Sequence, residues 1–212
     1  MPLPTLARAE RAGLADRLDQ GGPTAPTLCA GWRAVELAAH LVLRERRPDA
    51  GPGILLHPLA GWTLAVQRRI ARRPFSELVR LVRTGPPAWS PLGWPGMDAR
   101  ANTLEMFLHH EDLRRAAGSW EPRTLAAADQ DLLWRRLAGM ARLAMRRVGH
   151  GVVLCRPGGE EIVVRGGEPS VRVTGAPSEL VLFASGRQPH ARVEMEGSAD
   201  AIGRLEQAHL GL

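Results

Sequence analysis

Residues 103–112 read Thr-Leu-Glu-Met-Phe-Leu-His-His-Glu-Asp, and this stretch, taken as a helix, guides the interpretation of the rest of the chain. It sets Glu105 and His109 four residues apart. Residues at i and i+4 share one face of a helix, with Cβ atoms roughly 5–6 Å apart, so both side chains can reach one point in space. A carboxylate and an imidazole placed in this way provide two ligands of a metal site.

A third ligand is expected from residues 31–41, which read Gly-Trp-Arg-Ala-Val-Glu-Leu-Ala-Ala-His-Leu and place His40 in an otherwise apolar helical run. Burying His40, Glu105 and His109 without partners would cost several kcal/mol, and a shared divalent cation offsets that cost. Two imidazoles and a carboxylate suit zinc, or nickel, iron or manganese. Three protein ligands leave an open position, which is typical of a catalytic zinc site.

Two neighbouring residues leave alternatives open. Glu36 stands one turn before His40 and repeats the Glu-x-x-x-His spacing, so it is the main rival ligand. His110 points about 100° away from His109 on a helix and is expected on the surface or behind the ligands. The three predicted ligands can also form an internal hydrogen-bond network that holds no metal.

Asp112 has two possible roles. It follows His109 by close to one helical turn and can orient that imidazole. It can equally be an exposed charge paired with Arg114 or Arg115.

The chain has two cysteines, Cys29 and Cys155, far apart in sequence, so no disulfide framework or CxxC motif exists. Both are expected to be buried, reduced thiols. Packing is favoured for Cys29 over a reactive thiolate, because a low pKa needs a cationic environment.

Composition indicates a globular protein: the chain has 212 residues, of which 44% are hydrophobic. The N-terminal region lacks the pattern of a signal peptide, which is a basic segment followed by an apolar run and a small-residue cleavage site. No apolar stretch approaches the ~18–20 residues of a membrane span. We therefore expect a cytoplasmic protein with no membrane partner.

The basic residues are all Arg, with 22 Arg against 14 acidic residues before Val148 and 6 against 8 after it. They are dispersed as pairs, and aromatic residues make up only 4% of the chain, so the stacking platforms of a single-strand binder are missing. No nucleic-acid partner is expected, although a small anionic ligand is compatible with the charge.

Helical periodicity covers the first two thirds of the chain. Asp98 is the expected N-cap of one helix, and a break near Pro74 interrupts another. The predicted helices span 3–19, 32–46, 59–71, 75–82, 98–117 and 125–147.

After Val148 the pattern alternates, and short β runs at 152–155, 162–164 and 171–173 indicate a β-meander. A helix over 178–185, a strand over 191–195 and a helix over 199–208 follow. The fold class predicted is mainly α, with an antiparallel four-helix bundle over 1–147 and a small α+β domain over 148–212.

Several of these motifs resemble a known family. Residues 26–32, Pro-Thr-Leu-Cys-Ala-Gly-Trp, lead to His40, and Glu105 and His109 are followed by Glu-Asp-Leu-Arg-Arg at 111–115. This pattern resembles the metal-binding domain of mycothiol-dependent maleylpyruvate isomerases, a branch of the DinB-like helical bundles. Residues 179–197 are similar to the sterol-carrier-protein-like domain that follows the bundle in those proteins.

The resemblance covers nearly the whole chain and implies that His40, Glu105 and His109 are zinc ligands, with a water or a thiol in the fourth place. It implies mycothiol as co-substrate, and an isomerase or transferase in which a metal-bound thiolate attacks an electrophilic carbon. Arg187 is the predicted anchor for a carboxylate of the thiol or of an electrophilic or anionic substrate. The alternative is a non-catalytic metal- or ligand-binding module. Either is expected as a monomer or homodimer.

Overall fold

The computed structural model describes residues 5–54, 56–94 and 96–211, and it divides into two compact units, Met1–Trp120 and Glu121–Leu212. We call them the helical unit and the sheet unit. The sequence places the domain boundary after Arg147, whereas the compact units divide after Trp120. The helix predicted over 125–147 therefore lies in the sheet unit, where it packs on another helix and a strand.

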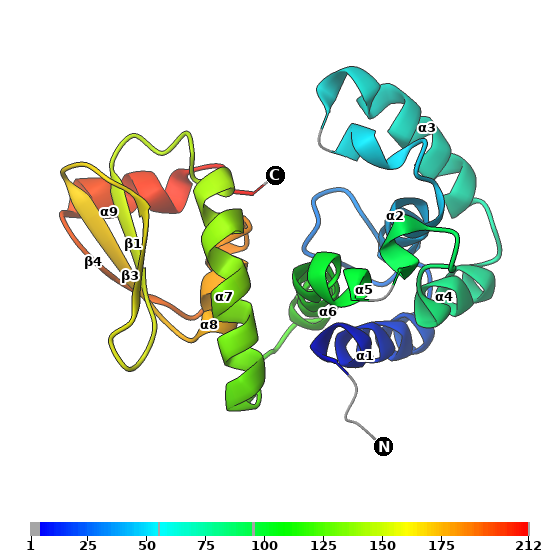
Figure 1. The fold of residues 1–212 in the computed structure, drawn as a ribbon, viewed down its shortest axis with the longest axis horizontal. Helices are drawn as coiled ribbons and strands as arrows, with labels where there is room; N and C mark the ends of the chain where they lie inside the picture. The colour runs from blue at the N-terminus through cyan, green and yellow to red at the C-terminus, as the bar shows by residue number, and fades with distance from the viewer. Residues whose placement is uncertain (1–4, 55, 95, 212) are drawn as a thin grey trace. The chain divides into compact units, whose positions relative to one another are not determined.

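The helical unit is a bundle in which α1 packs against α4 and α6, while α2 packs against α3 and α4 (Figure 1). The part of the predicted first helix before residue 5 lies outside the described residues. The bounds are α1 Leu6–Gly21, α2 Ala34–Arg46, α3 Ala60–Ala71, α4 Phe75–Thr84, α5 Met97–Ala101 and α6 Thr103–Ala116, with 3₁₀ turns η1 Gly51–Ile54, η2 His57–Leu59 and η3 Pro91–Gly93.

An apolar stripe on each main helix builds the core of this unit. Each stripe recurs every three or four residues, the spacing that puts side chains on one helix face. Fully buried members include Leu14 and Leu18 of α1, Leu37 and Leu41 of α2, Leu78 and Val82 of α4, and Met106 of α6.

The helix predicted over 98–117 is broken at Asn102, which separates α5 from α6. Asn102 is fully buried, and its amide nitrogen donates to Asp98 Oδ1 at 2.7 Å. The prediction of Asp98 as N-cap is wrong, because α5 begins one residue earlier, after Gly96 in a left-handed conformation (φ 75°). The Asp98 carboxylate instead accepts hydrogen bonds from Asn102 and from Arg11 of α1.

Over its described residues, 121–211, the sheet unit combines four strands with three helices. Helix α7 packs on α8 and β2, and α9 packs on β3. The bounds are α7 Ala127–Ala144, β1 Gly151–Cys155, β2 Glu161–Arg165, β3 Ser170–Thr174, α8 Pro177–Ala184, η4 Gln188–His190, β4 Glu194–Glu196 and α9 Ala199–Gln207.

The predicted β-meander is wrong. The strand order is β2-β1-β3-β4, and β1 is antiparallel to β2 but parallel to β3. The link from β2 to β3 therefore crosses the start of β1, where Gly167 O lies so close to Gly151 that a side chain at Gly151 would overlap it. The sequence pattern predicts where strands lie but not which strands pair, so it could not predict this crossing.

The predicted fold class is confirmed: the chain is mainly α, with a helical bundle followed by a small α+β part. Within the described residues, every helix is too short or too polar to span a bilayer.

Candidate metal centre

Helices α2 and α6 bring the three predicted metal ligands together. Glu105 Oε1 lies 3.1 Å from His40 Nε2 and 3.3 Å from His109 Nε2. The ligand atoms of all three lie within 4.8 Å of one another. Both imidazoles are buried, and the Glu105 side chain is 23% exposed. We call these residues the metal set.

The donor chemistry and spacing of the metal set fit a tetrahedral metal. Zinc takes imidazole nitrogen and carboxylate oxygen at about 2.0–2.2 Å, so two ligand atoms on one ion lie roughly 3.3 Å apart. The two distances from Glu105 Oε1, 3.1 and 3.3 Å, are close to that value. The same distances also make hydrogen bonds, so the metal-free network that the sequence left open shares this geometry.

The Trp32 side chain forms one wall beside the metal set, with its ring centroid 5.1 Å from that of His40. It is positioned by a turn in which the Thr27 hydroxyl donates to Trp32 O at 2.9 Å and accepts from the Cys29 N–H at 3.1 Å. Gly31 supplies the left-handed conformation (φ 75°) that this turn requires.

The protonation of the metal set is strongly perturbed. Burial would raise the pKa of the Glu105 carboxyl, but hydrogen bonds from His109 and His40 outweigh burial. With the charge of Arg44 added, they hold the pKa of Glu105 well below its ordinary value. Glu105 is therefore ionised, as a metal ligand must be.

The pKa values of the two imidazoles shift in opposite directions. Burial lowers the pKa of His40 despite its bond to Glu105. Burial also opposes the charged form of His109, but the pKa of His109 is raised well above its usual range by bonds to Asp112, Cys29 and Glu105. His40 therefore has no net proton to lose when it binds a cation, whereas His109 must first release one.

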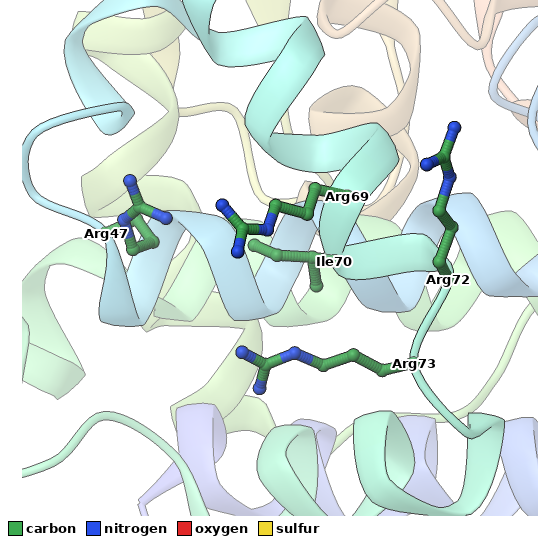
Figure 2. Close-up of a pocket in the computed structure, with 5 residues that line it drawn as sticks. All are labelled: Arg47, Arg69, Ile70, Arg72 and Arg73. Carbon is green, nitrogen blue, oxygen red and sulfur yellow. The ribbon is translucent and has the colours of Figure 1, made fainter.

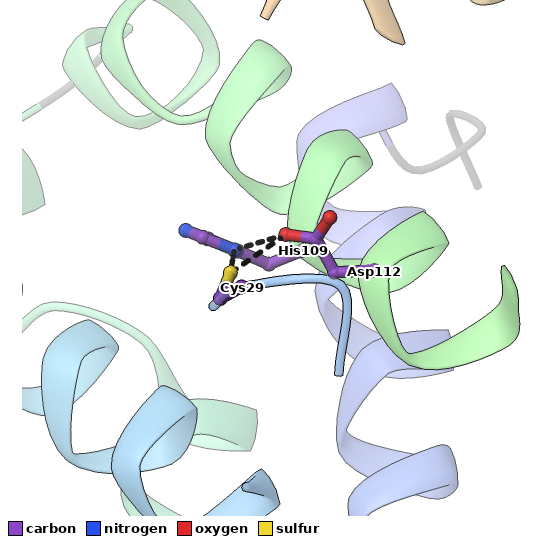
Figure 3. Close-up of side chains that lie close together, drawn as sticks. All are labelled: Cys29, His109 and Asp112. Carbon is purple, nitrogen blue, oxygen red and sulfur yellow. Dashed lines mark hydrogen bonds and ion pairs between the residues drawn. The ribbon is translucent and has the colours of Figure 1, made fainter. Parts of the chain in front are cut away.

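Asp112 and Cys29 lie on the other side of the His109 ring (Figure 3). Asp112 Oδ2 is 2.9 Å from His109 Nδ1 and 3.2 Å from Cys29 Sγ, and Sγ is 3.9 Å from Nδ1. Asp112 is fully buried, so the orienting role is the one the structure supports, and the exposed-charge alternative is wrong. The Asp112 carboxylate accepts a hydrogen bond from Nδ1–H, so the proton that a metal would displace is the one on Nε2, the atom that faces Glu105.

The sequence missed the contact of Cys29 with this pair. Cys29 is partly exposed, not buried as expected, whereas Cys155 is buried. Cys29, His109 and Asp112 form a second group whose ligand-type atoms lie within 4.8 Å of one another, sharing His109 with the metal set. No sequence spacing links Cys29 to residues 80 and more positions later, so only the tertiary structure could reveal the contact.

Glu36 and His110 have hydrogen-bond partners outside the metal set. Glu36 accepts the Arg33 backbone N–H at 2.9 Å at the start of α2, which explains the carboxylate there without a metal. His110 is buried and its Nδ1 lies 2.7 Å from Glu10 Oε2, so of the two positions expected for it the surface one is wrong. The cause is the close packing of α1 on α6: a Cβ at Gly13 would lie 2.5 Å from the His110 ring.

Arg187 belongs to the sheet unit, just after α8, where its guanidinium donates to Ser185 O at 2.6 Å. Its role as an anchor for a thiol or substrate stays a prediction.

A basic hollow of about 420 Å³ lies elsewhere in the helical unit (Figure 2). The guanidinium groups of Arg47 and Arg69 point toward one another, while Arg72 turns away. Two of its arginines are already paired with carboxylates, Arg47 with Asp49 and Arg73 with Glu77. The hollow shares no residue with the metal set; its lining is Arg47, Arg69, Ile70, Arg72 and Arg73.

Comparison with solved structures finds the same fold in the mycothiol-dependent maleylpyruvate isomerase. A mutant of that enzyme is 18% identical over 89% of this chain and 90% of its own, with a TM-score of 0.60. A second crystal structure of the isomerase is 17% identical over 90% of each chain, with a TM-score of 0.55. No family model and no curated protein matches the sequence. At this identity the likeness concerns the fold, and it agrees with the family resemblance of the sequence motifs.

Proposed function

We propose that the chain binds one divalent metal, zinc by preference, through His40, Glu105 and His109. The observation that carries the proposal is the convergence of these three ligand atoms from two helices within 4.8 Å. Two imidazoles and one carboxylate are a borderline donor set that suits zinc. An ionised Glu105 and an uncharged His40 are already in the protonation states that metal binding needs.

We further propose that the protein is a metal- and mycothiol-dependent isomerase or thiol transferase. The fold shared with the mycothiol-dependent maleylpyruvate isomerase over about nine tenths of both chains supports this choice. A metal held by these residues would supply Lewis acidity, which would lower the pKa of a bound thiol so that a thiolate is available at neutral pH.

The residues of the chain then have separate tasks. His40 and His109 would hold the cation together with Glu105, and the hydrogen bond to Asp112 would keep the remaining proton of His109 on Nδ1. The Trp32 ring lies beside His40, with the ring centroids 5.1 Å apart, and would limit water on that side. Arg187 is the proposed contact for a carboxylate of the thiol or of an electrophilic substrate.

Elemental analysis of the purified protein tests the metal. About one equivalent of zinc is expected in the parent chain, with loss in His109→Ala and in Glu105→Ala. His110→Ala is the matched control, because His110 is the next residue on α6, is equally buried and bonds to a carboxylate outside the metal set. It should keep the metal.

Turnover tests the reaction. The metal-loaded protein is incubated with mycothiol and maleylpyruvate, and then with other electrophiles, while loss of thiol and of electrophile are followed separately. Isomerisation without net thiol loss indicates an isomerase, and thiol loss indicates a transferase. Metal without turnover would favour the non-catalytic binding module. No metal even after reconstitution would refute the proposal and leave the hydrogen-bond network.

A further inference from the structure

We propose that Arg44 is a positioning residue that holds Glu105 toward the two imidazoles; this inference rests on the proposed metal site. Arg44 lies on α2 one turn after His40, and its side chain is only 20% exposed. Its Nε is 3.5 Å from Glu105 Oε1, the oxygen that also faces His40 and His109. Arg44 thus contacts the metal set from outside.

The guanidinium group is fixed by two further contacts at the break between α5 and α6. Nη2 donates to Ala101 O at 2.9 Å, and Nη1 donates to Asn102 Oδ1. The planar fork of an Arg side chain can make such contacts together with little freedom left to turn. Arg44 therefore joins α2, which carries His40, to the first turn of α6, which carries Glu105.

Asn102 is itself held on its far side. Its amide nitrogen donates to Asp98 Oδ1, and Asp98 also accepts from Arg11 Nη2 at 2.8 Å. Arg11 is in turn 2.6 Å from Glu45 Oε1, a carboxylate only 1% exposed. A chain of buried and partly buried polar contacts from α1 therefore fixes the residues to which Arg44 is anchored, and through Arg44 the ligand Glu105.

The contacts of Arg44 differ from those of an ordinary basic residue in the last turn of a helix. Such residues favour the carbonyl end of the helix while remaining exposed. Arg44 is largely covered and reaches across to a second helix. Its positive charge would by itself repel a cation, so an arginine here helps metal binding only if its gain in orienting Glu105 exceeds that repulsion.

The sign of the effect on zinc affinity is therefore the test. Arg44→Gln removes both the charge and the fork, and its Kd for zinc, measured by competition with a chelator, should rise about 10- to 100-fold, as for other residues that orient a metal ligand. Arg44→Lys keeps the charge and should recover part of the loss. The cobalt-loaded Arg44→Gln protein should show altered visible absorption bands.

Arg46→Gln is the matched control. Arg46 lies two residues further along α2, and its Nη2 donates to Gly85 O at 2.7 Å and to Thr84 Oγ1 at 3.1 Å, so it also links helices without contacting the metal set. It should leave the zinc Kd and the cobalt spectrum of the parent unchanged. Thermal unfolding of the metal-free proteins reports the structural effect of each variant.

Unchanged or tighter zinc binding by Arg44→Gln would overturn the inference while leaving the metal site intact. An equal loss in Arg46→Gln would also overturn it, because the effect would then come from fold stability. A parent protein without metal would refute the proposed function and this inference with it. If Arg44→Gln does not fold, Arg44→Lys decides: weaker zinc binding than the parent supports the role of the fork, and unchanged binding refutes it.

Discussion

The buried contact between Asp112 and His109 leads to a prediction for Asp112→Asn. Asp112 Oδ2 faces His109 Nδ1 at 2.9 Å and Cys29 Sγ at 3.2 Å, and the residue is fully buried. Asparagine keeps the size of the side chain but replaces one acceptor oxygen with a donor. The imidazole can then carry its proton on Nε2, the atom that faces Glu105 and must be free to bind a metal.

The magnitude follows from the contacts that are lost. A hydrogen bond to a charged group contributes about 1.5–3 kcal/mol, so the metal-free variant should lose roughly that much free energy of unfolding. Removing the carboxylate behind a metal-binding imidazole typically weakens metal affinity about 10- to 100-fold. That loss corresponds to roughly 1.4–2.8 kcal/mol of binding free energy.

The matched control is Glu10→Gln. Glu10 Oε2 lies 2.7 Å from His110 Nδ1 and is 3% exposed, so this variant disrupts an equally buried carboxylate–imidazole pair on the next residue of α6. Both variants should destabilise the metal-free protein, measured by thermal unfolding. Zinc affinity from chelator competition should fall only in Asp112→Asn. Equal zinc affinities in the two variants would refute the orienting role of Asp112.

Two further predictions concern pH and the sheet unit. Zinc affinity should fall about tenfold for each pH unit below the raised pKa of His109, because the metal must displace a proton from this imidazole. His40, with its lowered pKa, contributes no second displaced proton. Calorimetry in buffers of different ionisation enthalpy should detect about one proton released per metal at neutral pH, and release of none would contradict this. Gly151→Ala should destabilise the protein by about 1–3 kcal/mol, because its Cβ overlaps Gly167 O. Gly149→Ala, with open space around its Cβ, is the control in thermal unfolding, and equal shifts in Tm would argue against the crossing of β1.

The sequence could predict features that depend on neighbours along the chain. Helical periodicity placed Glu105 and His109 on one face of α6, and the structure puts their side chains 3.3 Å apart. The change of period after Val148 identified where the strands begin. Both features follow from backbone geometry, in which residues separated by one turn or by two positions share a face.

Other predictions were wrong because the local sequence pattern is compatible with more than one structure. The run of helix formers over 98–117 gave no sign of the break at Asn102, which depends on partners in α2. The position of α7 in the sheet unit was missed for a similar reason, since an amphipathic helix can bury its apolar face against another helix or a sheet.

The sequence by itself therefore determined most of the helices, the approximate positions of the strands and the pair of polar residues on α6. The tertiary structure decided which groups meet across the chain: His40 with Glu105 at 3.1 Å, Asp112 with Cys29 at 3.2 Å, and Arg44 with Glu105. The physical reason is the range of the forces involved. Backbone hydrogen bonding sets spacing within one element, whereas contacts between elements depend on how their apolar faces pack together, which no local pattern specifies.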